Sequence, residues 1–366
     1  MKPPSAGQLL LVGVRGPELE GEEAKLLQRV QPGGFILFGR NIKTPAQLRK
    51  LIDALRDLSK VEPIITIDQE GGRVSRLRLI GSEPPNAQQL REKGDGKLIQ
   101  EHGAITGRLL RLFGFNLDLC PVLDISFDDN SDNSLRGRCY GQSAQEVISN
   151  AGAFNDALRD AGVASCGKHF PGYSAATIDA HRDLPKIART RAELDGNELA
   201  VFRELASELD SMMICHGWYP VFEAKKKPAS LSHRVVTDLL RRELHFEGLV
   251  MTDDLDMGAI LNEYSFDEML RLALTAGNDL AMICHRVEKI GDALAVLEKL
   301  PRKDLDRALE NVAKFKCKLL PPVKFNQALF EQVDYEIWNL RVAALGIERA
   351  AERSAEDGAR SPVELY

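Results

Sequence analysis

The segments EGLVMTDD (residues 247–254) and DLAMICH (residues 279–285) decide the fold. Each is a short apolar run, and a helix-like stretch separates the two. Runs so rich in Val, Ile, Leu and Met are typical of strands that are buried on both faces of a parallel sheet. Six earlier runs of the same kind lie at residues 8–14, 33–38, 62–68, 115–125, 162–170 and 211–216.

Helix-like stretches alternate with these runs, as in PAQLRKLIDALRDLSK (residues 45–60) and QEVISNAGAFNDALRDAG (residues 145–162). Eight alternations of strand and helix predict the α/β class and, within it, a (β/α)8 TIM barrel with a C-terminal helical appendage. A doubly wound open sheet is the alternative architecture. A Rossmann fold is disfavoured because no G-x-G-x-x-G follows the first strand.

The chain has 366 residues, which suffices for one large barrel with added elements. We expect the barrel to span residues 1–300 and helices packed on its outside to span residues 301–352. The polar stretch at residues 353–366 is expected to be a disordered tail.

Composition excludes several classes of protein. Lys and Arg number 48 against 54 Asp and Glu, a net charge of −6, so the chain lacks the basic footprint of a nucleic-acid binder. No apolar run approaches the roughly 20 residues that a membrane span needs. The 6 cysteines show no C-x-x-C spacing and are typical of free thiols in a reducing compartment. We therefore expect a cytoplasmic monomer that binds neither nucleic acid nor a membrane.

Polar residues gather at the predicted carboxyl ends of the strands, where the chemistry of a TIM barrel is located. A random surface would not place ionisable groups after nearly every strand. The residues at this rim include Asp68, Glu70, Arg76, Asp124, Arg138, Lys168, His169, Asp179, His181, His216, Asp253, Asp254 and His285.

Two of these residues have several possible roles. Asp253 directly ends an apolar strand, so its carboxylate can point into the barrel mouth as a nucleophile or base. Asp is also a common helix N-cap, so Asp253 or Asp254 can serve that purpose instead. Lys168 is compatible with a Schiff-base nucleophile, with a hydrogen-bond donor to substrate hydroxyls, and with a structural Lys–Asp pair.

Asp179 and His181 form a compact Asp-x-His in the loop after the fifth strand. A carboxylate two residues from an imidazole can fold back and orient the ring, as a base and its orienting partner do. A surface loop without a catalytic role is the alternative. A metal site formed by His169, His181 and His216 is disfavoured, because the three come from different segments with no local ligand spacing.

Several segments carry motifs that occur in the same order in one known family. They are GGFILFGRNI (33–42), DQEGGRVSR (68–76), KHFPG (168–172) followed by Asp179-Ala180-His181, PASLS (228–232) and TDDLDM (252–257). These resemble the motifs of glycoside hydrolase family 3, in which K-H-F-P-G-H-G…D-S-H is the signature. More narrowly, they resemble its β-N-acetylglucosaminidases of the peptidoglycan-recycling type.

The resemblance implies a barrel enzyme that removes terminal β-linked N-acetylglucosamine with retention, from a small glycan such as a muropeptide, and that needs no cofactor or metal. Asp253 matches the nucleophile. His181 matches an acid/base on a mobile loop, with Asp179 as its partner. His216 matches a family position near the pocket. Sugar-binding positions are matched by Asp68, Arg76, Arg138, Lys168 and His169.

An imidazole exchanges its proton near neutral pH, so His181 can serve first as acid and then as base. We therefore expect a bell-shaped pH profile, with one limb from Asp253 and the other from His181. The loop departs from the family pattern at Tyr173-Ser174, which replaces His-Gly, and at Ala180, which replaces Ser. Loss of the glycine narrows the backbone conformations open to the loop.

Other functions stay open at this point. A member of the same family can be phosphorolytic or of broader hexosaminidase specificity, since a neutral imidazole does not repel an incoming anion. A Schiff-base aldolase using Lys168 and a non-catalytic sugar-binding protein are the alternatives of other classes.

Overall fold

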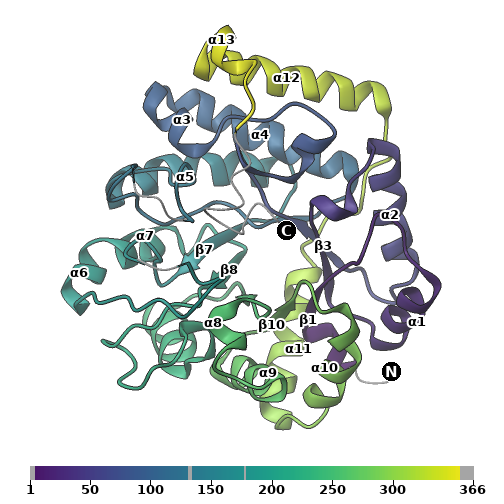
Figure 1. The fold of residues 1–366 in the computed structure, drawn as a ribbon, viewed down its shortest axis with the longest axis vertical. Coiled ribbons are helices and arrows are strands. Elements are labelled where there is room, and N and C mark those ends of the chain that lie inside the picture. The colour runs from purple at the N-terminus through teal and green to yellow at the C-terminus, as the bar shows by residue number, and fades with distance from the viewer. Residues whose placement is uncertain (1–4, 131–133, 177–178, 355–366) are drawn as a thin grey trace.

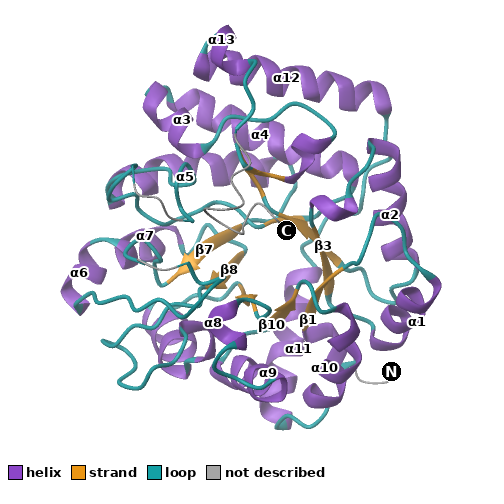
Figure 2. Ribbon diagram, viewed as in Figure 1, coloured by secondary structure: helices purple, strands orange, loops and turns teal. Residues whose placement is uncertain are grey.

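The computed structural model describes residues 5–130, 134–176 and 179–354. Eight parallel strands stand at its centre and helices surround them (Figures 1 and 2). The strands are β1 (Leu10–Gly13), β2 (Gly34–Leu37), β3 (Ile64–Ile67), β6 (Leu117–Asp118), β7 (Cys166–Phe170), β8 (Ser211–Ile214), β9 (Leu249–Asp254) and β10 (Leu280–Ile283). Every predicted run contains one of them.

The strands are hydrogen-bonded in the order β6-β3-β2-β1-β10-β9-β8-β7. Two further parallel bridges, from Leu117 to Ala164 and from Val122 to Lys168, connect the two ends of this order. The sheet thereby curls into a nearly closed barrel, and the predicted (β/α)8 fold is confirmed.

Helices cover the outside of the barrel (Figure 1). Those between and after the strands are α1 (Gly21–Val30), α2 (Pro45–Asp57), α3 (Ala87–Lys93), α4 (Gly96–Phe113), α5 (Ala144–Asp160), α6 (Arg191–Gly196), α7 (Glu198–Leu205), the π-helical segment η5 (Arg234–Glu243), α8 (Gly258–Leu261), α9 (Phe266–Ala276) and α10 (Ile290–Leu297). Short 3-10 turns are η1 (Ala6–Leu9), η2 (Gly39–Asn41), η3 (Arg76–Leu79), η4 (Ala229–Leu231) and η6 (Val287–Lys289).

Helix α2 shows how the sequence specifies these elements. The Thr44 hydroxyl accepts a hydrogen bond from the Gln47 N–H at 3.1 Å, and Pro45 occupies the first helical position, where its missing N–H costs nothing. The buried positions then recur every three or four residues, which places them on one face of the helix. They are Leu48, Leu51, Ile52 and Leu55.

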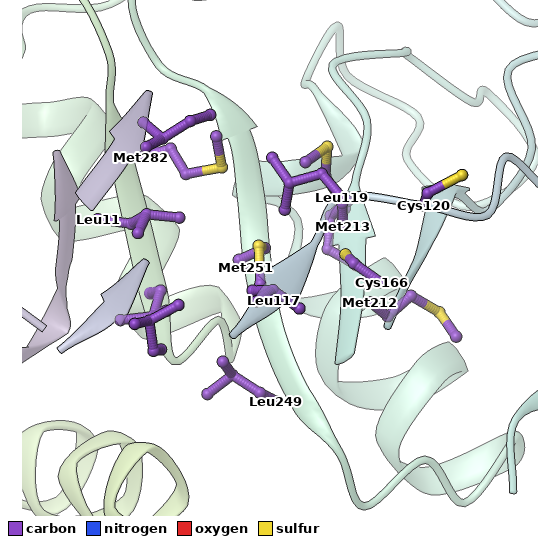
Figure 3. Close-up of a cluster of buried hydrophobic side chains, with 14 of the residues drawn as sticks. Leu11, Leu117, Leu119, Cys120, Cys166, Met212, Met213, Leu249, Met251 and Met282 are labelled. Atoms are coloured by element: carbon purple, nitrogen blue, oxygen red, sulfur yellow. The ribbon is translucent and has the colours of Figure 1, made fainter. Parts of the chain in front are cut away.

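Apolar side chains fill the inside of the barrel. Figure 3 shows Leu11, Leu117, Met213, Met251 and Met282 gathered between strands that are far apart in the sequence. All five are at most 3% exposed, and burying a side chain of this size contributes about 1.5–3 kcal/mol. The unbranched methionines fit irregular gaps between the strands.

Two features of the fold were not predicted. Residues 191–209 have the sequence pattern of one continuous helix, but the helix is broken at Asn197. Asn197 has φ −126° and ψ −95° and follows the poor helix former Gly196. A hairpin of β4 (Gln69–Gly71) and β5 (Val74–Ser75) follows β3. Its turn requires glycine, because Gly71 has φ 110° and a Cβ there would lie 2.3 Å from the Pro85 carbonyl oxygen.

The C-terminal helices are α11 (Arg302–Lys316), α12 (Gln327–Leu345) and α13 (Ile347–Ala350). Helix α11 packs against η1, where Lys316 Nζ donates to Gln8 Oε1 at 2.7 Å. Helix α12 lies along α4 and α3 (Figure 1). The boundary at residue 300 stays a prediction, and the predicted tail lies outside the described residues from residue 355 onward.

The cysteines are free thiols, all buried except Cys317. Across residues 5–130, 134–176 and 179–354, no helix combines the length and the apolar character needed to cross a membrane.

Candidate active site

A cavity with an empty volume of about 520 Å³ opens at the carboxyl ends of the strands. A second cavity of about 290 Å³ adjoins it. Arg138, His169, His181 and Asp253 line both. Asp68, Arg76 and Lys168 line the larger one, and Asp179 lines the smaller. The fold therefore brings together all the residues predicted from the sequence to act on or bind the substrate.

A buried ion cluster forms one wall. Lys168 Nζ lies 2.8 Å from Asp68 Oδ1 and 2.6 Å from Glu70 Oε1. Arg138 donates two hydrogen bonds of 2.8 Å to the Glu70 carboxylate, the bidentate geometry that guanidinium favours. Arg76 Nη2 lies 3.5 Å from Asp68 Oδ2. Each carboxylate thus contacts two cations.

These ion pairs determine the protonation states of Asp68, Glu70 and Lys168. Burial raises the pKa of Asp68 and of Glu70, but Lys168 together with Arg76 or Arg138 outweighs burial and holds both pKa values below their usual range. Burial lowers the pKa of Lys168, and the two carboxylates outweigh it and raise that pKa above its usual value. Lys168 therefore stays protonated at neutral pH, which suits a donor to hydroxyls and not a Schiff-base nucleophile.

His169 is oriented by Asp124, which is fully buried. Asp124 Oδ2 lies 2.6 Å from His169 Nδ1 and accepts from the His169 main-chain N–H at 3.2 Å. Arg138 Nη2 lies 3.5 Å from the other ring nitrogen. The ring is held from both sides, so its orientation towards the cavity is set before any ligand arrives.

The Asp179–His181 pair has the predicted local geometry. Asp179 Oδ1 lies 2.7 Å from His181 Nδ1 and accepts from the His181 main-chain N–H at 3.0 Å. The loop also docks on the start of α8, where Gly258 N donates to His181 O at 3.1 Å and Ala259 N donates to Ala180 O at 2.9 Å. These bonds place the imidazole at the cavity that Asp253 also lines.

The residues that depart from the family motif take part in holding this loop. Tyr173 Oη accepts from the Ala180 main-chain N–H at 2.9 Å. Ser174 Oγ accepts from the Ile125 main-chain N–H at 2.8 Å. One of these hydrogen bonds therefore joins two parts of the loop, and the other ties the loop to the segment that follows β6.

Asp253 and Asp254 end strand β9 and differ in their surroundings. The Asp254 carboxylate accepts from Asp256 N at 2.9 Å and from Cys284 N at 3.2 Å, and it lies 3.3 Å from His285 Nε2. Burial raises the pKa of Asp254, and the hydrogen bond with His285 leads the contacts that outweigh burial and lower it. Asp254 lines the larger cavity, but its carboxylate is engaged by groups that follow β9 and β10. Asp253 lines both cavities.

His216 lies behind this strand end and lines neither cavity. Its Nε2 lies 2.8 Å from the Asp254 carbonyl oxygen and its Nδ1 lies 2.7 Å from Ser230 Oγ. Burial lowers the pKa of His216, so the ring is neutral, with Nε2–H donating to the carbonyl and Nδ1 accepting from the hydroxyl. His216 and Ser230, from the PASLS segment, therefore support the backbone next to Asp253.

Glu70 pairs with Arg138 and Lys168, and Asp124 holds the ring of His169, contacts that were not predicted from the sequence. One feature of the sequence does point to Glu70. It lies two residues after Asp68, and an extended chain places side chains at that spacing on the same face. Another feature is the number of cations at the rim, which need carboxylate partners when buried. Within the part of the chain that the structure describes, no three His, Cys, Asp or Glu side chains are grouped to hold a metal ion.

Comparison with known proteins agrees with this geometry. Residues 5–315 match the profile described as the glycosyl hydrolase family 3 N terminal domain. A beta-hexosaminidase of Vibrio cholerae is 36% identical over 302 residues, which cover 82% of this chain and 88% of that protein. A beta-hexosaminidase of Pseudomonas aeruginosa is 33% identical over 292 residues, which cover 80% and 86%.

Solved structures show the same fold. A family 3 beta-N-acetylglucosaminidase from a Paenibacillus species superposes with a TM-score of 0.85 at 33% identity, covering 93% of this chain and 68% of that one. NagZ from Neisseria gonorrhoeae, solved in complex with N-trifluoroacetyl-D-glucosamine, superposes with a TM-score of 0.78 at 27% identity, covering 91% and 97%. The match of barrel, site and sequence over most of the chain shows that this protein belongs to glycosyl hydrolase family 3 and is a glycoside hydrolase.

Proposed function

We propose that this chain removes terminal β-linked N-acetylglucosamine with retention of configuration, through a glycosyl-enzyme on Asp253. The observation that carries the proposal is the shared cavity, which Asp253 and His181 line together with a ring of paired cations and carboxylates. The relatives' names support the same sugar, since they are beta-hexosaminidases and a beta-N-acetylglucosaminidase.

In the first step the Asp253 carboxylate attacks the anomeric carbon, and the bond to the leaving oxygen breaks. His181 donates a proton to that oxygen. Because Nδ1 is bonded to Asp179, the proton that is transferred in this proposal is the one on Nε2. Asp179 stabilises the imidazolium before the transfer and fixes the ring, as the third member of a catalytic triad does.

In the second step water attacks the anomeric carbon of the glycosyl-enzyme. Neutral His181 takes the proton of that water at Nε2, and the Asp253 carboxylate is released. Retaining glycosidases use one group as acid and then as base, and the imidazole replaces the usual second carboxylate here.

Lys168, Arg76, Arg138, Asp68 and His169 bind ring hydroxyls in this proposal. Their ion pairs fix the positions of these side chains before the sugar enters. Binding the sugar therefore costs little additional side-chain entropy. Contacts that strengthen in the transition state raise kcat as well as affinity.

For the leaving group we propose a muropeptide fragment in the cytoplasm. Support comes from the motifs shared with family members of the peptidoglycan-recycling type and from free cysteines, which suit a reducing compartment. The preferred leaving group is tested by measuring kcat/KM for two disaccharides: N-acetylglucosamine β-linked to N-acetylmuramic acid, and chitobiose. Equal kcat/KM values would contradict a preference for the muramyl group.

The activity is tested with 4-nitrophenyl N-acetyl-β-glucosaminide, measured with and without phosphate. We expect wild type to release N-acetylglucosamine, folded Asp253→Ala to lose turnover, and phosphate to leave the product unchanged. A sugar 1-phosphate product would point to a phosphorylase. Sugar binding without turnover of any glycoside would contradict the proposal.

A further inference from the structure

Helix α12 contacts the loop that carries part of the candidate sugar site, although the matched family profile ends before it, at residue 315. Two residues of the helix, two turns apart on one face, make the contact. Asp334 accepts from Ser82 N at 2.5 Å and from Ser82 Oγ at 3.1 Å. Arg341 donates to Glu83 Oε1 at 3.0 Å and to the Glu83 carbonyl oxygen at 3.1 Å.

Glu83 is the centre of this contact. It is 3% exposed and Arg341 is also 3% exposed. The Glu83 carboxylate also accepts from Ser354 Oγ at 2.7 Å and from Arg78 Nη1 at 3.0 Å. Burial raises the pKa of Glu83, and the Ser354 hydroxyl, Arg341 and Arg78 outweigh burial and lower it, so Glu83 is ionised at neutral pH.

The segment around Glu83 contacts the two parts of the chain that carry Arg76 and Glu70. Arg78 belongs to the turn η3, which begins at Arg76. The next residue, Pro84, accepts from Gly72 N at 2.9 Å in the turn of the hairpin that contains Glu70. The positions of Arg76 and Glu70 therefore depend on a segment that α12 holds in place. Figure 1 shows α12 lying along α3 and α4, with the chain returning from α13 towards the barrel.

We infer that Arg341 and Asp334 of helix α12 are positioning residues, which hold residues 82–84. They thereby hold the sugar-binding residue Arg76 and also Glu70, the carboxylate that pairs with Lys168 and Arg138. The C-terminal helix is in this account part of the substrate site, although it touches no substrate. The inference rests on the proposed function for the role of Arg76, but the placement of the loop can be measured without any activity.

The test uses the full chain with Arg341→Met, Arg341→Lys and Asp334→Asn. We expect Arg341→Met to raise KM for 4-nitrophenyl N-acetyl-β-glucosaminide about tenfold with a smaller change in kcat, and Arg341→Lys to restore part of the loss. Amide hydrogen exchange should rise across residues 69–84 in Arg341→Met. Asp334→Asn keeps the shape of the side chain and serves if Arg341→Met fails to fold.

The matched control is Glu336→Gln. Glu336 lies on the same helix and pairs with Arg108 of α4 on the exposed side, away from the loop. The Glu336→Gln variant should leave KM unchanged, and it should leave amide hydrogen exchange at residues 69–84 unchanged. In an Arg76→Met background, Arg341→Met should change KM less than it does in wild type, because part of its effect on KM passes through the position of Arg76.

Unchanged KM and unchanged exchange at residues 69–84 in both Arg341→Met and Asp334→Asn would overturn the inference. Additive effects of Arg341→Met and Arg76→Met on KM would also overturn it. If wild type turns over no N-acetylglucosaminide, the proposed function fails, and the exchange measurement still decides whether α12 holds the loop.

Discussion

Lys168 connects two carboxylates of the site, the partly buried Asp68 and the buried Glu70. Three cations face these two carboxylates once Arg76 and Arg138 are counted, so the cluster retains donors that a neutral sugar can use. Lys168 therefore has two roles in this proposal. It donates to sugar hydroxyls, and its charge offsets the cost of removing the two carboxylates from water.

Replacing Lys168 with Met tests both roles. Breaking a buried pair leaves uncompensated charge, so we expect the free energy of unfolding to fall by about 3–5 kcal/mol. We expect kcat/KM to fall at least about 100-fold, since a donor to the sugar is lost. Urea unfolding and steady-state kinetics at a temperature where the variant is folded measure the two effects. Normal turnover by folded Lys168→Met would contradict the assignment.

Tyr173 stands where the family motif has histidine, and its hydroxyl accepts from Ala180 N. Tyr173→Phe should reduce kcat/KM about fivefold, the value of one lost hydrogen bond, because the Asp179–His181 loop is held less firmly. The loss should be larger for substrates with poor leaving groups, which need the proton from His181, than for nitrophenyl glycosides. The same loss for both kinds of substrate would show that the hydroxyl acts elsewhere.

At the scale of elements, the loop between β7 and α6 reaches its position by docking on helix α8. A Cβ on Gly258 would lie 2.6 Å from Arg182 O and 2.7 Å from His181 O, so the close approach requires glycine. The TDDLDM motif ends at Met257, just before α8, so it did not indicate a role for Gly258. The contact between α8 and the loop is tertiary, and local sequence does not predict it.

Gly258→Ala should therefore displace the His181 backbone, because a contact that short cannot be relieved by a side-chain rotation. We expect kcat to fall about tenfold or more, because a displaced imidazole no longer has the geometry that proton transfer requires. Gly196→Ala is the matched control, because a Cβ there meets nothing within 4 Å. Equal kinetics for the two variants would contradict the docking.

At the scale of the whole molecule, the eight strands could be predicted because a strand buried on both faces leaves an apolar run in the sequence. The residues at the strand ends could be predicted for a related reason, since a barrel collects them at one rim. The pairing of Lys168 with Glu70, the support of Asp253 by His216 and the contact of Arg341 with Glu83 could not. Each joins segments far apart in sequence, and no local pattern encodes such a distance.

The stability of the molecule should also depend on Glu198 of α7. This side chain is fully buried, and within the described structure neither carboxylate oxygen has a hydrogen-bond partner. Burial raises its pKa to about 7. A pKa raised above the unfolded value of about 4.3 means that the folded state binds the extra proton, so stability is lost as pH rises from about 4.3 to 7.

Glu198→Gln removes this titration. Wild type should lose about 3 kcal/mol of unfolding free energy between pH 4.5 and pH 8 through this group, and the variant should not lose it. Urea unfolding of both proteins at the two pH values measures the difference. A difference between the proteins that is the same at both pH values would show that Glu198 ionises in the folded state without cost.

The proposed mechanism depends most on Asp253 as the nucleophile that forms a glycosyl-enzyme. Its most direct test is mass spectrometry after treatment with 5-fluoro-N-acetylglucosaminyl fluoride, whose ring fluorine slows hydrolysis of the intermediate. We predict that wild type gains the mass of one glycosyl group, that the mass maps to the peptide containing Asp253, and that Asp253→Ala gains none. A label on Asp254 or on any other carboxylate, or turnover by wild type with no label, would contradict the account.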